Sequence, residues 1–193
     1  MKTGVVALQG GVAEHVSMLR RIGAETVEVR LPEDLEGLDA LIIPGGESTT
    51  LIRLMERWAL ADPIGNLVRR GLPVWGTCAG AILLCSEISE SEHEISQRSL
   101  GLARVKAVRN AFGRQVHSFV QDLQVEGIAA PYPGVFIRAP LLEPLDPCVQ
   151  VLARIGEGAV FLREDRMWLS SFHPELTDDP RVHELFLGFA RES

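Results

Sequence analysis

Cys78 has the strongest chemical context in this sequence of 193 residues. It lies in the stretch VWGTCAGAILL, where an apolar strand-like run meets a helical one, and the glycines Gly76 and Gly80 flank it. The G-x-C-x-G spacing is the cysteine form of a nucleophile elbow, a sharp turn that exposes a reactive atom at the end of a strand. The N-terminus of the following helix favours a thiolate, and the Ala79 N–H can stabilise an oxyanion. The pattern predicts a nucleophilic cysteine.

The alternative for Cys78 is a small buried residue in a turn, because free cysteines are often buried and inert. The flanking glycines favour catalysis over that alternative. Cys85 follows two helical turns later and is interpreted as a core residue deeper along the same helix. Cys148, between a proline and a valine, has no chemical context.

A nucleophilic cysteine needs a base, and the base needs a group that orients it. The stretch SSFHPEL supplies both, because His173 ends an apolar strand and Glu175 follows it after Pro174. Residues two apart in an extended chain lie on the same side, so the Glu175 carboxylate is expected to hold the imidazole. One alternative is a purely structural His–Glu hydrogen bond. Another is a metal site, which lacks a third ligand at a useful spacing.

The other four histidines have weaker contexts. His93 falls in a polar loop and His183 in the C-terminal helix, where solvated roles suffice. His117 lies on a strand-like run with no acidic residue nearby. His15 lies in the first helix, close to residues 9–11, which allows a role at the rim of a site or at an interface.

Two kinds of loop could contact a substrate. In PGGEST, residues 44–49, the glycines Gly45 and Gly46 allow close approach of the backbone and can supply a second oxyanion donor. A phosphate-binding loop is the rival interpretation, but the Lys-Ser/Thr pair of such loops is absent. Arg109 in RNAFGRQ and Arg138 in FIRAP are candidates for holding a carboxylate through the planar guanidinium. Surface arginines are the alternative for each.

The first half of the chain alternates between strand and helix patterns. Strands are predicted at residues 3–9, 25–30 and 39–46 and at PVWGT, and helices at GVAEHVSMLRRIG, ESTTLIRLMERWAL, DPIGNLVRRG and CAGAILLCSEI. This alternation indicates right-handed βαβ crossovers and a parallel sheet covered on both faces. Ligands bind at the C-terminal ends of the strands in such sheets, which singles out residues 9–11, 45–48 and 77–80.

The second half contains short strand-like runs separated by glycine, proline and acidic turns. They are ARVKAVRN, QVHSFVQDLQV, GVFIRAP, VQVLARI, GAVFLRED and RMWLSSF. We expect them to add antiparallel or mixed strands to the parallel core. Residues 86–99 are predicted to be a mobile loop, and a last helix is predicted to start at or near Pro180. Without a repeat or a linker, one domain over residues 1–193 is expected.

The composition excludes some classes of function. The net charge of −7 and the pI of about 5.3 argue against a nucleic-acid-binding protein. No apolar run approaches the roughly 20 residues that cross a bilayer, and the N-terminus lacks a signal-peptide pattern. Three cysteines without a C-x-x-C pair predict neither a disulfide framework nor a structural zinc site. A cytoplasmic protein that binds no nucleic acid and no membrane is therefore expected.

The elbow GTCAG, the stretch SSFHPEL and the loop PGGEST together resemble the class I, or triad, glutamine amidotransferases. The segments ALQGGVAEH, RNAFGRQ and GVFIRAP make nearly the whole chain similar to the glutaminase subunits of pyridoxal 5'-phosphate synthases within that class. The resemblance implies a three-layer α/β/α flavodoxin-like sandwich, with a mostly parallel central sheet and additional antiparallel strands in the second half. It also implies hydrolysis of L-glutamine to L-glutamate and ammonia through a glutamyl thioester.

The resemblance assigns roles to individual residues. It implies that Cys78 is the nucleophile, His173 the base and Glu175 the residue that orients the base. It implies that the contacts to L-glutamine come from Gly46, Glu47, Ser48, Arg109, Ile137 and Arg138, and the oxyanion hole from Gly46 and Ala79. It further implies docking on a separate (β/α)8-barrel synthase subunit, which consumes the ammonia. No pyridoxal phosphate or metal cofactor is implied for the glutaminase step.

Three other functions stay open on the sequence. The chain could be a triad glutaminase that serves a different synthase, or a non-catalytic regulatory subunit that kept the fold. A cysteine peptidase on the same architecture is the third. The two arginines and the PGGEST loop favour a small amino-acid substrate over a peptide.

Overall fold

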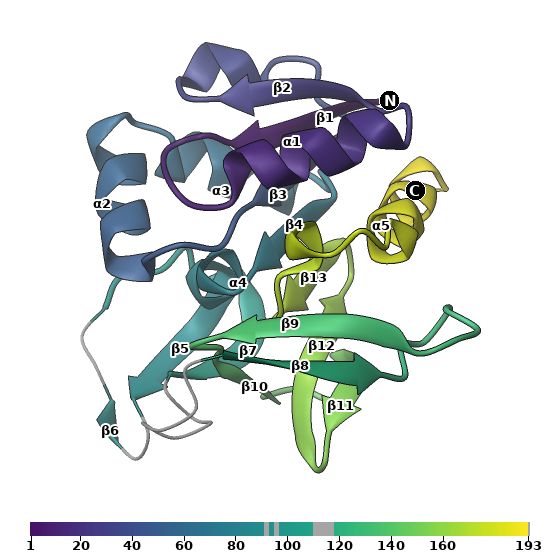
Figure 1. Cartoon of the computed structure of the whole chain (residues 1–193). Coiled ribbons are helices and arrows are strands. Elements are labelled where there is room, and N and C mark those ends of the chain that lie inside the picture. The colour runs from purple at the N-terminus through teal and green to yellow at the C-terminus, as the bar shows by residue number, and fades with distance from the viewer. Residues whose placement is uncertain (91–92, 95–96, 110–117, 193) are drawn as a thin grey trace.

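A computed structural model describes residues 1–90, 93–94, 97–109 and 118–192 (Figure 1). The helices are α1 (Val12–Arg21), α2 (Ser48–Arg57), α3 (Ala61–Arg69), α4 (Ala79–Leu84) and α5 (Arg181–Arg191), with short 3-10 turns at Pro32–Leu35 and Pro174–Leu176. The strands are β1 (Lys2–Val6), β2 (Glu25–Val29), β3 (Ala40–Ile43), β4 (Val74–Thr77), β5 (Cys85–Glu90), β6 (His93–Glu94), β7 (Ala103–Arg109), β8 (Ser118–Leu123), β9 (Tyr132–Ile137), β10 (Leu141–Pro144), β11 (Gln150–Ile155), β12 (Gly158–Glu164) and β13 (Met167–Ser170).

A large mixed sheet forms the centre of the molecule, with strand order β2-β1-β3-β4-β13-β12-β10-β7-β5-β6 and β11 added beside β12. The five strands from β2 to β13 in this order run parallel to one another. The pairs of β12 with β13, β10 and β11 are antiparallel, as is the pair of β10 with β7. The α/β prediction of a mostly parallel core with added antiparallel strands is confirmed.

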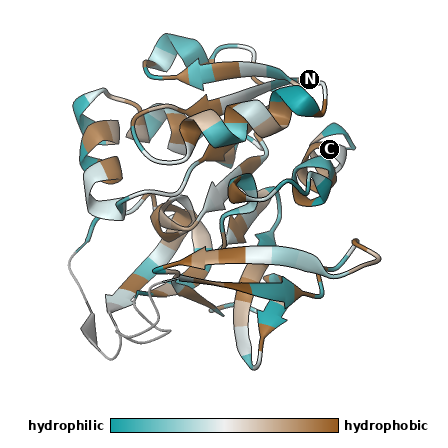
Figure 2. Cartoon of the chain, in the orientation of Figure 1, coloured by the Kyte–Doolittle hydropathy of each residue, from teal (hydrophilic) through white to brown (hydrophobic). Residues whose placement is uncertain are grey.

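Two apolar layers lie on the two faces of this sheet. One contains side chains of α2, α3 and α4, and the other contains side chains of α1, α5 and the separate β8–β9 hairpin. Strand β3 shows why both faces are covered, because Leu41 and Ile43 point into the first layer and Ala40 and Ile42 into the second. The central helix α4 carries almost no hydrophilic colour in Figure 2, as expected for a helix enclosed by the fold.

The predicted helix CAGAILLCSEI is wrong in its second half. Helix α4 ends at Leu84, and residues 85–90 form strand β5, which runs parallel to β7. In CSEISE the apolar residues Cys85 and Ile88 lie three positions apart, a spacing that fits a helix, so the local pattern does not indicate the strand. Residues 86–90 and 93–94 of the predicted loop 86–99 are strands, and residues 91–92 and 95–96 lie outside the described part of the chain.

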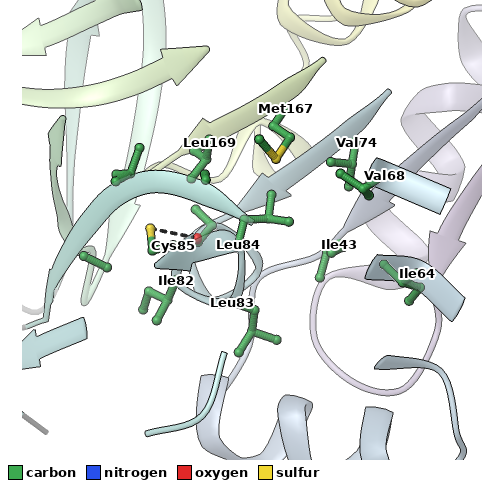
Figure 3. Close-up of a cluster of buried hydrophobic side chains, with 14 of the residues drawn as sticks. Ile43, Ile64, Val68, Val74, Ile82, Leu83, Leu84, Cys85, Met167 and Leu169 are labelled. Atoms are coloured by element: carbon green, nitrogen blue, oxygen red, sulfur yellow. Dashed lines mark hydrogen bonds between the residues drawn. The ribbon is translucent and has the colours of Figure 1, made fainter. Parts of the chain in front are cut away.

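Cys85 is a core residue, as predicted, but it begins β5 and does not continue the helix. Its side chain is fully buried, and its Sγ donates a hydrogen bond to the Ala81 carbonyl at 3.2 Å (Figure 3). Burial raises the pKa of this thiol. Leu83, Leu84 and Leu169 lie in the same apolar cluster, so Cys85 acts as a small apolar side chain.

Within the residues that the structure describes, the helices are too short or too polar for any of them to cross a membrane. The C-terminal helix begins at Arg181 with Pro180 as its N-cap, as predicted. Strand β10 was not predicted; its sequence LLEP contains a proline, which is a weak strand pattern. It pairs with β7 through Leu141–Pro144 and connects the parallel core with the far edge of the sheet.

Candidate active site

Cys78 forms the predicted elbow between β4 and α4. Its φ of 48° and ψ of −103° lie in a region that L-residues rarely adopt, and its N–H donates to the Ser170 carbonyl at 2.7 Å. Strain of this kind costs of the order of 1–3 kcal/mol and persists where the surrounding structure enforces it. The thiol Sγ lies 3.9 Å from the Ile137 carbonyl oxygen, and the residue is only 6% exposed.

Both flanking glycines are required by close packing around the elbow. A Cβ on Gly76 would lie 2.5 Å from the backbone of Gly80, and a Cβ on Gly80 would lie 1.9 Å from the carbonyl oxygen of Ile43. Backbone atoms cannot give way as a flexible side chain can. The G-x-C-x-G spacing therefore has a steric basis, because only glycine fits at either position.

His173 and Glu175 reach Cys78 because β13 and β4 are adjacent parallel strands. Ser170 pairs with Thr77, so the chain leaves both strands at the same edge of the sheet. The backbone N–H of His173 then donates a hydrogen bond to the Val135 carbonyl at 2.8 Å. The imidazole Nδ1 of His173 lies 2.8 Å from Glu175 Oε1. The other ring nitrogen, Nε2, has no hydrogen-bond partner among the described residues.

The predicted contact between His173 and Glu175 is present, but the local geometry differs from the extended chain that was expected. Strand β13 ends at Ser170, and Pro174–Leu176 form a 3-10 turn with His173 as its N-cap. The turn, and not the alternation of a strand, brings the carboxylate back to the imidazole. Glu175 is 6% exposed and lies behind His173 as seen from Cys78.

The buried ionisable groups around His173 shift the pKa values of one another. Burial lowers the pKa of His173, but the neighbouring Cys78 and Glu175 outweigh that effect and raise it to about 10. Burial raises the pKa of Glu175, whereas the neighbouring imidazoles of His15 and His173 bring it below its usual value. An imidazolium held by an ionised carboxylate follows from these two shifts, next to the thiol.

A pocket of about 220 Å³ opens over the elbow. Its walls include all the predicted substrate and oxyanion residues, together with Ile82, which was not predicted: Gly46, Glu47, Ser48, Cys78, Ala79, Ile82, Arg109, Ile137, Arg138 and His173. The pocket therefore joins the ends of β3, β4, β7 and β9 with the turn after β13. Arg138 has a φ of 45°, so a second strained residue lies at this pocket.

The loop of residues 44–49 is held in place from two sides. Gln9 donates its Nε2–H to the Glu47 carbonyl at 2.7 Å, and a Cβ on Gly10 would lie 1.6 Å from the Gly45 carbonyl oxygen. Gly10 has a φ of 90°, which glycine adopts without strain. The predicted ligand loops at residues 9–11 and 45–48 are thus packed against each other beside the pocket.

Glu47 uses its side chain to cap helix α2. Its carboxylate accepts hydrogen bonds from the N–H groups of Thr49 at 3.0 Å and Thr50 at 2.7 Å, and from the Thr50 hydroxyl at 2.6 Å. Burial raises the pKa of this carboxyl, but the hydrogen bonds from both threonines outweigh it and lower the pKa to about 2. Since the carboxylate is turned toward the helix, only the backbone of Glu47 is free to serve a ligand.

We expect Glu47→Ala to lower the free energy of unfolding by about 1 kcal/mol at neutral pH, because N-cap side chains contribute on that scale. A carboxyl with a lowered pKa in the folded state stabilises the fold above its ordinary pKa of 4.5 and loses that effect as the pH falls toward 2. The difference between wild type and variant should therefore shrink between pH 4.5 and pH 2 in urea titrations. Glu157→Ala, at an exposed turn, is the control; an equal loss there would contradict the cap.

Three residues at the site were missed or misjudged on the sequence. Gln97 accepts hydrogen bonds from Ser48 Oγ at 3.2 Å and Arg109 Nη1 at 2.8 Å, which links two walls of the pocket. His15 and His183 are both fully buried, so the rim role of His15 and the solvated role of His183 are wrong. The sequence held only a partial signal for His183, which shares a helical stripe with Phe186, Leu187 and Ala190, all of them buried.

Other predicted features fall outside the site or the described chain. His117 and residues 110–115 of RNAFGRQ are not among the described residues, and nothing is described of the His93 side chain. Cys148 is exposed and contacts Arg104 far from Cys78 in sequence and sheet order. Among the described side chains, no group of three His, Cys, Asp or Glu residues is arranged as metal ligands.

Known proteins resemble the chain over its full length. A model of the SNO glutamine amidotransferase family matches residues 5–191. A Deinococcus radiodurans protein named pyridoxal 5'-phosphate synthase subunit PdxT is 47% identical over 193 residues, which cover 100% of this chain and 98% of the relative. A protein of the same name from Herpetosiphon aurantiacus is 50% identical over 190 residues, covering 97% of this chain and 100% of the relative.

Solved structures share the fold of this chain. A crystal structure of a glutamine amidotransferase, 49% identical, superposes with a TM-score of 0.91 and covers 98% of both chains. The PurLQS structure from Thermotoga maritima, 17% identical, has a TM-score of 0.75 over 97% of this chain and 98% of that chain, and shows the fold alone. The flavodoxin-like class I amidotransferase fold expected from the sequence is confirmed. On the match of the family model and the full-length relatives, the chain belongs to the SNO glutamine amidotransferase family.

Proposed function

We propose that this chain is the glutaminase subunit of a pyridoxal 5'-phosphate synthase and supplies that enzyme with ammonia from L-glutamine. Curated relatives at 47% and 50% identity carry the name of a subunit of this synthase. The observation that carries the activity is the convergence of Cys78 and His173 in one pocket, with Glu175 at 2.8 Å behind the imidazole. The chain as a whole acts as one glutaminase domain in this proposal.

Acylation uses groups that already face one another. The Cys78 thiolate attacks the side-chain amide carbon of L-glutamine, and the N–H groups of Ala79 and Gly46 hold the oxyanion that forms. The His173 imidazolium gives its proton to the amide nitrogen, which leaves as ammonia. Glu175 keeps the ring in the orientation that this transfer needs.

Deacylation regenerates the enzyme. The neutral His173 takes a proton from water, and the resulting hydroxide attacks the glutamyl thioester. The carbon–sulfur bond then breaks, which releases L-glutamate and leaves the thiolate paired with the imidazolium again. No cofactor or metal takes part in these steps as proposed.

Substrate selection is assigned to the pocket walls. The guanidinium groups of Arg109 and Arg138 hold the α-carboxylate, and Ser48 with the backbone of Gly46, Glu47 and Ile137 completes the enclosure. A pocket of about 220 Å³ suits a single small amino acid better than a peptide. This size favours a glutaminase over the cysteine peptidase considered above.

Gly45 gives a prediction that tests the site geometry. A Cβ at this residue would lie 2.5 Å from His173 Cε1 and 3.3 Å from Cys78 Cβ. We expect Gly45→Ala to displace the imidazole and to lower kcat for ammonia release roughly 100-fold, because small misplacements of reacting groups cost about that much. The matched control is Gly188→Ala, where a Cβ on α5 meets nothing within 4 Å. Equal activity of both variants would contradict the close packing.

The partner is proposed to be the (β/α)8-barrel subunit of the synthase. This chain has three free cysteines and an acidic composition, and both agree with the cytoplasm as the location of this chain. The test is ammonia release from L-glutamine, measured for this chain alone and with the synthase subunit of the same organism. Stimulation by that subunit, and not by an unrelated amidotransferase synthase, is expected. Failure to release ammonia under both conditions would refute the proposed function.

A further inference from the structure

A chain of buried polar groups runs behind Glu175, on the side away from the pocket. Glu175 Oε1 faces His173, and Glu175 Oε2 lies 3.4 Å from His15 Nε2, which is an ion-pair distance; Oε2 has no hydrogen bond among the described residues. The same Nε2 lies 3.3 Å from Thr77 Oγ1, and His15 Nδ1 lies 3.0 Å from His183 Nε2. The catalytic carboxylate is thus held between two imidazoles, and a third imidazole supports the second one.

The three residues behind Glu175 come from separate elements and are all buried. His15 lies on α1, Thr77 ends β4, and His183 lies on α5, and each is 0% exposed. The indole of Trp75 meets the edges of both histidine rings, with centroids 6.0 Å from His15 and 5.0 Å from His183. Burying two imidazoles together costs free energy unless their nitrogens are paired.

The positions of the protons follow from what each group can donate. An ionised carboxylate only accepts hydrogen bonds, so His15 Nε2 must carry a proton to face Glu175 Oε2 without repulsion. If His15 is neutral, its Nδ1 is then an acceptor, and His183 Nε2–H is the donor that it meets. His183 Nδ1 is left as a bare lone pair, and this atom has no partner among the described residues.

The charged alternative is less favourable. An imidazolium at His15 would donate from both nitrogens, so His183 would have to accept at Nε2 and carry its proton on Nδ1. That would bury an N–H group without a partner in the described part of the chain, which costs more than a bare lone pair. Burial lowers the pKa of His15 although the charge of Glu175 opposes this shift, and burial beside the His15 ring lowers the pKa of His183.

We propose that His15 is a positioning residue for glutamine hydrolysis, with its donor nitrogen fixed toward Glu175 by a hydrogen bond from His183. His15 holds the second carboxylate oxygen, so that the first oxygen stays aimed at His173 Nδ1. His183 sets which nitrogen of His15 carries the proton. The inference rests on the proposed function, because its kinetic effect is on the Cys78–His173 reaction.

His15→Leu replaces the imidazole with a side chain of similar size that has no hydrogen-bond donor. We expect kcat for ammonia release, measured with the synthase subunit present, to fall about 10- to 100-fold, because Glu175 Oε2 loses its polar neighbour at 3.4 Å and is left against an apolar side chain. KM should change less than about twofold, since His15 does not line the pocket. His15→Gln, whose amide N–H can take the place of Nε2–H, should recover much of kcat.

His183→Phe tests the outer member of the chain. Phenylalanine keeps a ring against Trp75 but removes the N–H that fixes His15, so kcat should fall with KM again unchanged. Phe186→Leu is the packing control, because Phe186 also contacts Trp75, with centroids 5.4 Å apart, and has no polar group. Equal losses of kcat in His183→Phe and Phe186→Leu, or in both His15 variants, would overturn the proposal.

Nitrogen-15 NMR of the imidazoles provides a test that does not depend on activity. In the full-length wild type at neutral pH, His15 and His183 should both be neutral, with the proton on Nε2. A charged His15, or a proton on its Nδ1, would overturn the inference even if every variant folded poorly. Loss of ammonia release in the wild type itself would refute the proposed function, while the NMR result would still decide the proton arrangement.

Discussion

Cys78→Ala is expected to abolish ammonia release from L-glutamine while the fold stays intact. Loss of the nucleophile in a comparable triad enzyme lowers kcat by about 10⁶-fold, so activity should fall below detection. The substitution removes one sulfur atom from a residue 6% exposed, and the backbone contact from Cys78 N–H to Ser170 remains available. The measurement is ammonia release with the synthase subunit, together with the melting temperature of the variant.

Cys148→Ser is the matched control, because it removes a thiol from an exposed residue outside the pocket. Its activity should equal that of the wild type. If Cys78→Ala releases ammonia at the wild-type rate, Cys78 is not the nucleophile and the proposed function loses its chemical basis. Loss of the fold in Cys78→Ala would be visible in the melting curve and would direct the test to Cys78→Ser.

His173→Ala is expected to have the second largest effect, with kcat/KM lowered by about 10⁴-fold or more. In the proposed mechanism His173 both protonates the leaving ammonia and activates the water, and we expect no other described group in the pocket to replace it. Glu175→Gln should cost less, because Glu175 orients the ring through the 2.8 Å contact to Nδ1 and does not touch the substrate.

The order of these two losses is what the triad geometry predicts. Steady-state ammonia release by His173→Ala, Glu175→Gln and the wild type gives it directly. A Glu175→Gln variant as active as the wild type would show that the carboxylate has no role in orienting the imidazole. A larger loss at Glu175 than at His173 would reverse the assigned roles.

The meeting of Cys78 and His173 could be predicted because it depends on strong local patterns. The glycines around Cys78 leave few possible turns, and the apolar runs of β4 and β13 identify buried strands. Adjacent parallel strands end at the same edge of a sheet, so residues 95 positions apart come together (173 − 78). Residue patterns already indicated residues 45–48, Arg109 and Arg138 as pocket walls, whereas Ile137 followed from the family resemblance alone.

Other features depend on contacts that no local pattern contains. The boundary between α4 and β5 at Cys85 is set by the pairing of β5 with β7, which is a long-range contact. The burial of His183 depends on α5 packing beside α1 on the same face of the sheet, where His15 is its partner. A histidine on an apolar stripe can be buried or exposed, and the sequence does not show which until the neighbouring helix is known. Tertiary contacts therefore determine both the end of α4 before Cys85 and the burial of His183.

The most direct test of the Cys78–His173–Glu175 site is covalent labelling by a glutamine analogue that carries an electrophilic carbon in place of the amide. The wild-type chain, bound to its synthase subunit, is treated with the analogue, and the adduct is located by peptide mass spectrometry. We predict one adduct, on Cys78, that L-glutamine suppresses and that forms much more slowly in His173→Ala. No adduct, or an adduct on Cys85 or Cys148 in place of Cys78, would contradict the proposed active site.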